Sequence, residues 1–225
     1  MTLHVFDDLE QGSDEWLAAR RGIVTASVVG QLITPGTIKP ASNDTSRGLT
    51  MILAAERITG HTEPVYVNAD MQRGSDDEPV ARDLYRQHYA PVVEVGFMVN
   101  DNYGAPIGFS PDGLVDEDGF IEIKSPRAKT HLATILADAV PSYNMAQIQC
   151  GLVVSGRAWC DFISYRDGWP LYVKRVLPDP KWRDAIINAA TLAEHNIANL
   201  IATYATNTAG LHMTERTPDL DEMVI

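Results

Sequence analysis

The sequence predicts an α/β (α+β) domain in which helices flank a central mixed β-sheet. The first observation for this class is that segments with helical spacing alternate with short apolar runs bounded by Gly and Pro. The second is composition, since 45% of the 225 residues are hydrophobic, enough for one sizeable core. The third is that the sequence contains no internal repeat, so we expect one domain over residues 1–225.

The charge and the cysteines limit the class of protein. A net charge of −12 has the wrong sign for a protein that holds nucleic acid by overall basicity, so any DNA contact must use a local basic patch. Cys150 and Cys160 lie among apolar residues and are expected to be buried free thiols, as in a reducing cytoplasm. No apolar run approaches the roughly 20 residues of a membrane span, and residues 1–10 lack a signal-peptide pattern.

The first elements are expected to be two helices on either side of Gly22. Ser13 or Asp14 can cap the first helix, and Thr25 can cap a second that runs to Ile33. These helices carry a tryptophan, two arginines and a serine that could serve structure or function.

Trp16 is most simply a core anchor, and Arg20 and Arg21 are most simply solvated helix residues. The functional alternative is that one arginine and the Ser27 hydroxyl bind a phosphate near a helix N-terminus. Residue types alone favour the structural interpretation.

A polar segment separates these helices from the next one. Residues 35–48 are rich in Gly, Pro, Ser, Thr and Asn, which indicates a mobile loop exposing Lys39 and Arg47. Residues 49–60 have helical spacing and end on a glycine, and residues 62–68 are expected to form a short extended stretch.

An acidic cluster precedes the next predicted helix. Pro79 suits the first turn of a helix that runs to about residue 89. The acidic residues before it would complement the helix dipole. Alternatively, Glu78 leaves this helix start to serve as a metal ligand.

The second half of the chain supplies the predicted sheet. In one of its predicted helices, Gln147 and Gln149 lie between apolar neighbours. Such a glutamine is usually packed or solvated. Beside an active site it could instead hold a phosphate or a water. The expected strands are 92–100, 108–114, 120–124, 158–165 and 171–177, the expected helices are 130–139, 142–154 and 182–206, and residues from about 207 to 225 are expected to be a loose tail or a subunit-contact arm.

The segment from Gly108 to Lys124 is predicted to form two strands joined by a tight turn. Alternate side chains of a strand share a face, so Glu122 and Lys124 point the same way, and the hairpin can fold Asp112 back beside Glu122. Two close carboxylates repel unless a cation lies between them, and oxygen ligands suit Mg²⁺ or Mn²⁺. The structural alternative is a salt-bridged strand edge and an ordinary turn aspartate.

The spacing of this motif resembles a known nuclease core. Pro111-Asp112, nine residues, and Glu122-Ile123-Lys124 resemble the PD-(D/E)xK superfamily. Four separated segments further resemble one family, the lambda exonuclease-type phage recombination nucleases (YqaJ-like viral recombinases): Gln11-Gly12…Trp16…Arg20…Gly22…Thr25-Ala26-Ser27; Gly74…Glu78…Ala81-Arg82; Ser110-Pro111-Asp112-Gly113-Leu114 with Glu122-Ile123-Lys124-Ser125-Pro126; and Met145-Ala146-Gln147-Ile148-Gln149.

This resemblance implies a Mg²⁺-dependent exonuclease. It would degrade the 5′-phosphorylated strand of double-stranded DNA from 5′ to 3′ and leave a 3′ single-stranded overhang for phage-type homologous recombination by single-strand annealing. The implied assembly is a ring-shaped homotrimer that works with a single-strand annealing protein, in the cytoplasm of a bacterial host of a phage or prophage. No membrane partner is implied.

The resemblance also implies the roles of individual residues. Glu78, Asp112, Glu122 and the Ile123 carbonyl become ligands of two Mg²⁺ ions, which Mn²⁺ could replace, and Lys124 becomes the catalytic lysine. A pocket for the 5′ phosphate and a channel for DNA are also implied. The sequence departs from the family pattern at Val28, where an acidic residue is common. The pocket residues are Arg20, Ser27, Ser110 and Gln147, and the candidates for the channel are Lys39, Arg47, Arg73 and Lys129.

Two other functions remain open from the sequence. One is a PD-(D/E)xK endonuclease or repair nuclease, which would cut a covalently closed circle that an end-dependent exonuclease leaves intact. The other is a non-cleaving DNA-end-binding protein, although such a protein has no need of Asp112, Glu122 and Lys124 together.

Overall fold

The strands among the described residues form two four-stranded sheets and a separate two-stranded hairpin. In the computed structural model, which describes residues 2–64 and 66–216, the strands are β1 (Leu3–Phe6), β2 (Val24–Thr25), β3 (Ile33–Thr34), β4 (Lys39–Pro40), β5 (Phe97–Asn100), β6 (Ile107–Phe109), β7 (Gly113–Val115), β8 (Gly119–Lys124), β9 (Trp159–Ser164) and β10 (Tyr172–Val176). One sheet has the order β1-β5-β6-β2 and the other β10-β9-β8-β7, while β3 and β4 pair separately. Each four-stranded sheet is mixed, because β2 pairs with β6 and β8 with β9 in parallel.

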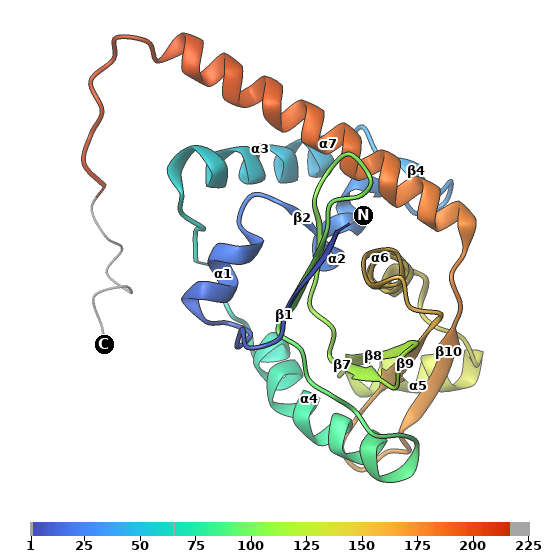
Figure 1. The fold of residues 1–225 in the computed structure, drawn as a ribbon. Coiled ribbons are helices and arrows are strands. Elements are labelled where there is room, and N and C mark those ends of the chain that lie inside the picture. The colour runs from blue at the N-terminus through green and yellow to red at the C-terminus, as the bar shows by residue number, and fades with distance from the viewer. Residues whose placement is uncertain (1, 65, 217–225) are drawn as a thin grey trace.

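The helices surround these sheets (Figure 1). They are α1 (Asp14–Arg20), α2 (Ala26–Val29), α3 (Asp44–Thr59), α4 (Ala69–His88), α5 (Ala128–Ala137), α6 (Met145–Ser155) and α7 (Pro180–Asn207), with 3₁₀ turns at Gly30–Leu32 and Ser142–Asn144. Figure 1 shows α7 running along one side of the molecule next to α3, with α4 on the opposite side. The predicted mixed α/β class is therefore confirmed, with the strands divided between two sheets.

Helix α6 connects the two sheets through the core. Its residues are apolar nearly all round, which is the composition of a buried helix. Gly151 lets the helix approach closely, since a Cβ there would lie 2.8 Å from ring atoms of both Phe109 and Phe120. These rings come from β6 and β8 and meet edge to face with centroids 5.0 Å apart. The packing thus fixes β6, which precedes Asp112, and β8, which carries Glu122 and Lys124.

The N-terminal elements agree in part with the sequence prediction. The Ser13 hydroxyl caps α1 by accepting from the Trp16 backbone N–H at 3.2 Å, and Gly22 follows the helix with φ +68°. The second helix is shorter than predicted: α2 ends at Val29, and a 3₁₀ turn leads into β3. Thr25 makes no side-chain cap bond there. The strand β1, which pairs with β5, was not predicted.

The prediction of a mobile loop over residues 35–48 was wrong. This segment contains β4, and α3 already begins at Asp44. The physical reason is a capping box, in which Asn43 accepts from the Ser46 backbone N–H at 2.9 Å and the Ser46 hydroxyl accepts from the Asn43 backbone N–H at 3.1 Å. A short extended stretch was expected over residues 62–68, but residues 62–64 and 66–68 form no β-strand.

The predicted helix start at Pro79 was also wrong. Helix α4 begins at Ala69, because the Asn68 side chain accepts from the backbone N–H groups of Asp70 and Met71 at 2.9 and 3.0 Å. Glu78 consequently projects from the middle of a 20-residue helix rather than from its first turn.

The remaining elements follow the prediction with shifted ends. The strand expected over residues 92–100 is reduced to β5, and the strand expected over 108–114 is split into β6 and β7. The helices α5, α6 and α7 and the hairpin of β9 and β10 are confirmed. Cys150 and Cys160 are buried free thiols, as expected. Within the described residues no helix has both the length and the apolar character needed to cross a membrane, and residues 217–225 of the expected tail lie outside them.

Candidate active site

The end of β8 carries an acidic and a basic side chain in contact. Glu122 is completely buried, and its Oε1 lies 2.6 Å from the Nζ of Lys124. Their spacing of two residues puts both on one face of the strand, as predicted. Ile121 and Ile123, on the other face, are buried in a second apolar cluster with Tyr85 of α4.

The loop between β6 and β7 holds Asp112 beside this strand. Its Oδ2 accepts a hydrogen bond from the Ile123 backbone N–H at 2.6 Å, while its carbonyl oxygen accepts from the Nε of Arg82 at 2.6 Å. Gly113, the next residue, lets the chain pass close to Val92, because a Cβ there would lie 2.1 Å from Cγ1 of Val92. The Ile123 backbone N–H therefore holds the Asp112 carboxylate, and the Arg82 side chain holds the Asp112 backbone.

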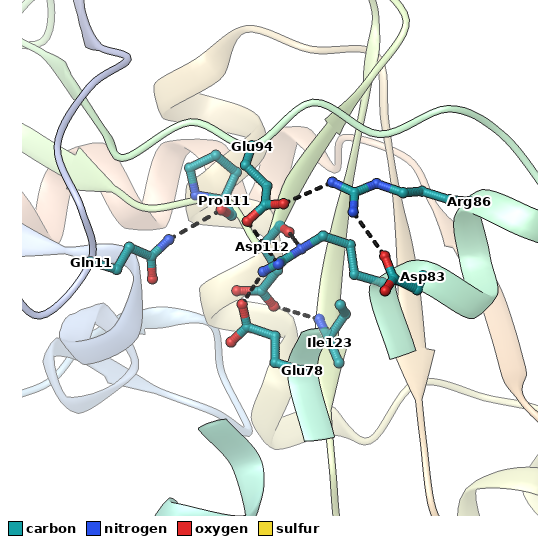
Figure 2. Close-up of polar contacts among 9 residues, drawn as sticks. Gln11, Glu78, Asp83, Arg86, Glu94, Pro111, Asp112 and Ile123 are labelled. Carbon is teal, nitrogen blue, oxygen red and sulfur yellow. Dashed lines mark hydrogen bonds and ion pairs between the residues drawn. The ribbon is translucent and has the colours of Figure 1, made fainter. Parts of the chain in front are cut away.

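Glu78 joins the site from α4 through Arg82. The guanidinium of Arg82 binds the Glu78 carboxylate one turn away and reaches Glu94 at 2.8 Å. Figure 2 shows the carboxyl groups of Glu78 and Asp112 directed toward one another, with Glu94 and Arg86 extending the network. The sequence analysis did not single out Arg82 as a site residue, although its position four residues after a candidate ligand was a usable signal.

The carboxyl groups of this site have raised pKa values. Burial and the charge of Asp112 raise the pKa of Glu78 to about 7, against the lowering effect of Arg82. Burial raises the pKa of Glu122 to about 7 although Lys124 opposes the rise, and burial raises the pKa of Asp112 as well. Burial alone would lower the pKa of Lys124, but the neighbouring carboxylates outweigh it and raise that pKa.

Carboxylate oxygens are the donor type that a hard divalent cation prefers. Apart from its ion pair with Lys124, neither oxygen of the buried Glu122 has a hydrogen-bond partner among the described residues, so the site has unused acceptors. In the described part of the chain no group of three or more His, Cys, Asp or Glu side chains is arranged so that it could hold a metal ion. Lys124 and Arg82 pair with Glu122 and Glu78 in this arrangement.

A small cavity adjoins the carboxylates. It has a volume of about 160 Å³, and Asp112 forms part of its wall. The Nη2 of Arg20 donates to the hydroxyls of Thr25 at 3.3 Å and Ser27 at 3.2 Å. All four predicted phosphate-binding residues line this cavity: Arg20, Ser27, Ser110 and Gln147.

The cavity wall also contains residues that the sequence analysis assigned otherwise or left out. Trp16 was predicted to be a core anchor, but it is half-buried and lines the cavity. Gln11 and Thr25 also line it, and the Nε2 of Gln11 donates to the Pro111 carbonyl at 3.4 Å. By contrast, Gln149 packs in the core, where it bonds the backbone of residues 177 and 179.

The predicted DNA-contact residues lie outside this cavity. Lys39 is exposed on β4, and Arg47 is exposed on α3, where it pairs with Asp44 at 2.5 Å. Arg73 is half-buried and pairs with Asp70 at 2.6 Å. Lys129 is exposed on α5.

Comparison with known proteins places the chain in a family. Residues 15–158 match the YqaJ-like viral recombinase domain, and this range contains every proposed metal and phosphate ligand. The chain belongs to that family. Its fold is also that of an alkaline exonuclease (LHK-Exo) from Laribacter hongkongensis, with 33% identity, a TM-score of 0.78, and coverage of 89% of this chain and 100% of that chain.

Two further solved structures are similar to this chain. The LHK-Exo structure in complex with dAMP matches with a TM-score of 0.79 and the same 33% identity, over 89% of this chain and 100% of that one. A phage-related exonuclease from Haemophilus somnus 129PT shares the fold at 16% identity and a TM-score of 0.62, over 81% of this chain and 96% of the other. No curated protein matches the chain.

Proposed function

We propose that this protein is a Mg²⁺-dependent exonuclease that degrades the 5′-phosphorylated strand of double-stranded DNA from 5′ to 3′. Family membership and the likeness to LHK-Exo support an exonuclease. The observation that carries the finer proposal is the cavity in which Arg20, Ser27, Ser110 and Gln147 meet next to Asp112. A site for a terminal phosphate directly beside metal-binding carboxylates selects a strand end rather than an internal bond.

The carboxylates define the reacting centre. Asp112, Glu122, the Ile123 carbonyl and Glu78 would hold Mg²⁺. Because metal ligands must be deprotonated and the pKa values of Glu78 and Glu122 are raised to about 7, we expect Mg²⁺ to bind more tightly as the pH rises through 7. When bound, a divalent ion activates water and stabilises charge on the attacking and leaving oxygens. Arg82 keeps the Glu78 side chain and the Asp112 loop in place through its bonds to both.

Lys124 supplies a positive charge at the same point. Because the surrounding carboxylates raise its pKa, it carries its proton at neutral pH. Its ammonium can therefore orient the attacking water and offset the negative charge that develops on the phosphate oxygens. Loss of such a stabiliser costs about 10²–10³-fold in rate in other enzymes.

The phosphate cavity suits repeated action along one strand. Attack of water on the phosphorus that follows the terminal nucleotide breaks the bond to the 3′ oxygen, so a 5′-mononucleotide leaves with a 3′ hydroxyl. The phosphate remains on the shortened strand and becomes its new 5′ end. Each turnover thus regenerates the group that the Arg20 cavity is proposed to bind. No base-reading groups are needed, so sequence preference should be weak.

The biological setting belongs to the same proposal. The remaining 3′ overhang is the substrate of single-strand annealing, so we propose a role in phage-type recombination with an annealing protein in the bacterial cytoplasm. A homotrimeric ring around duplex DNA would bring Lys39 and Arg47 toward a channel while acidic residues face outward. This would reconcile DNA binding with the net charge of −12.

The deciding experiment is digestion of linear duplex DNA with Mg²⁺, comparing 5′-phosphorylated with 5′-hydroxyl ends. We expect faster 5′→3′ degradation from the phosphorylated end and no detectable activity for Lys124→Ala. A covalently closed circle should stay intact. Equal cutting of the circle would instead indicate an endonuclease or repair nuclease, and DNA binding without any cutting would indicate an end-binding protein.

A further inference from the structure

One aromatic side chain contacts two of the proposed phosphate ligands at once. Trp16 and Arg20 stand four residues apart on α1, so they share a helix face. The guanidinium carbon of Arg20 lies 4.0 Å from the centroid of the Trp16 ring. This stacking holds the flat guanidinium against the indole at the wall of the cavity.

The other contact of Trp16 is with Ser110, on the loop between β6 and β7 that also carries Asp112. Its Nε1–H donates a hydrogen bond to the Ser110 Oγ at 2.9 Å. An indole N–H can only donate, so the Ser110 oxygen must be the acceptor in this bond. The hydroxyl hydrogen of Ser110 is then left to donate to another acceptor.

The position of Ser110 gives this hydrogen bond a consequence for catalysis. Ser110 and Asp112 belong to the same loop, and both line the cavity with Arg20. Trp16 therefore links the helix that carries the cationic ligand to the loop that carries a metal-binding carboxylate. A residue that only filled space would need neither contact, and Trp16 is half-buried rather than enclosed in the core.

We infer that Trp16 is a positioning residue that sets the preference for a 5′-phosphorylated end, by directing the Ser110 hydroxyl and the Arg20 guanidinium toward a terminal phosphate. This inference rests on the proposed function. It assigns a specificity role to a side chain that need not touch the phosphate itself.

The test is a double-mutant cycle of Trp16→Phe, Ser110→Ala and the combined variant. Trp16→Phe keeps an aromatic ring for Arg20 but removes the N–H. Release of the first nucleotide is measured on short duplexes with 5′-phosphate and 5′-hydroxyl ends, because later cycles all start from a phosphate. The ratio of kcat/KM between the two ends should fall roughly tenfold for Trp16→Phe, the scale of one hydrogen bond to a charged group, mainly through a higher KM.

The combined variant distinguishes positioning from general damage. If Trp16 acts through Ser110, the double variant should show about the same ratio as Ser110→Ala alone. Trp169→Phe is the matched control, because it makes the same chemical change at a ring that packs edge to face on His131, with centroids 5.7 Å apart. Its ratio should equal that of the unmodified protein.

Two results would overturn the inference in different ways. If the unmodified protein prefers phosphorylated ends and Trp16→Phe keeps that preference, or if the two single effects simply add, Trp16 does not position Ser110. If the unmodified protein has no preference at all, the phosphate pocket of the proposed function fails, and the role of Trp16 fails with it. Should Trp16→Phe not fold, an unchanged ratio for Ser110→Ala would still overturn the inference, because Trp16 is proposed to act through that hydroxyl.

Discussion

The buried carboxyl groups couple pH to stability at the scale of single residues. Glu78 and Glu122 have pKa values of about 7 in the folded protein, compared with the ordinary value of 4.5. Without metal, the folded state therefore binds more protons than the unfolded state between these values. The sign is that the free energy of unfolding falls as pH rises from about 4.5 to about 7.

Urea unfolding in EDTA at about pH 5 and about pH 7.5 measures this effect, which we expect to amount to a few kcal/mol at most. Glu122→Gln removes one titrating group and should show a smaller pH dependence. Added Mg²⁺ should restore stability more strongly at the higher pH, since metal ligands must be deprotonated. Stability that rises with pH in EDTA would contradict the assignment of these pKa values.

At the scale of elements, the turn between α1 and β2 positions the phosphate ligands. The backbone N–H of Gly22 donates to the Glu56 carboxylate at 2.7 Å, and its carbonyl accepts from the Nε of Arg57 at 2.6 Å. Arg57 in turn binds both oxygens of Glu194 on α7 at 2.6 Å. Helices α3 and α7 thus hold the turn that separates Arg20 from Ser27.

A pair of glycine substitutions tests this support. Gly22 and Gly60 both have φ +68°, but a Cβ at Gly22 would lie 2.4 Å from Cγ of Arg57, whereas none of the surrounding atoms lies within 4 Å of a Cβ at Gly60. Both Ala variants suffer backbone strain of about 1 kcal/mol. Gly22→Ala should lose about 1–3 kcal/mol more in chemical unfolding, because of the clash.

The activity of the two glycine variants gives a second readout. Gly22→Ala should also lower kcat/KM for 5′-phosphorylated ends, since the turn between Arg20 and Ser27 must shift. Gly60→Ala should leave it unchanged. Equal losses of stability in both variants would show that the Arg57 side chain moves away from the added Cβ without destabilising the protein.

At the scale of the whole molecule, an acidic protein must bind a polyanion. Lys39 on β4 and Arg47 on α3 are exposed, and we predict that they contact DNA phosphates. Lys39→Glu and Arg47→Glu should weaken DNA binding and reduce the dependence of log K on log salt by about 1 for each lost phosphate contact. Fluorescence anisotropy over a salt series measures both quantities.

The control for this prediction is Lys181→Glu, which makes the same charge reversal in the first turn of α7. It should change affinity only through the net charge. An unchanged affinity and salt slope for both Lys39→Glu and Arg47→Glu would remove these residues from the DNA path.

The sequence by itself determined the chemical groups and their local spacing. Glu122 and Lys124 share a face because the period of a strand is two residues, and Asp112 lies beside them because a short hairpin returns the chain. The apolar run of α6 and the amphipathic pattern of α7 are likewise local signals, and both helices were predicted from them. The starts of α3 and α4 were misplaced because the cap Asn43 lay inside a predicted loop and the cap Asn68 lay at the end of a predicted extended stretch.

Only the tertiary structure decided which distant groups meet. Trp16 and Ser110 are separated by 94 positions, and Arg82 and Asp112 by 30, so no local period relates them. Their contacts arise because α6 packs the two sheets together and α4 lies against β8. Burial in that arrangement also raises the pKa values of the carboxyl groups, a property of the assembled site rather than of any segment. Residue types and spacing therefore gave the chemistry, and packing gave the pocket and its electrostatics.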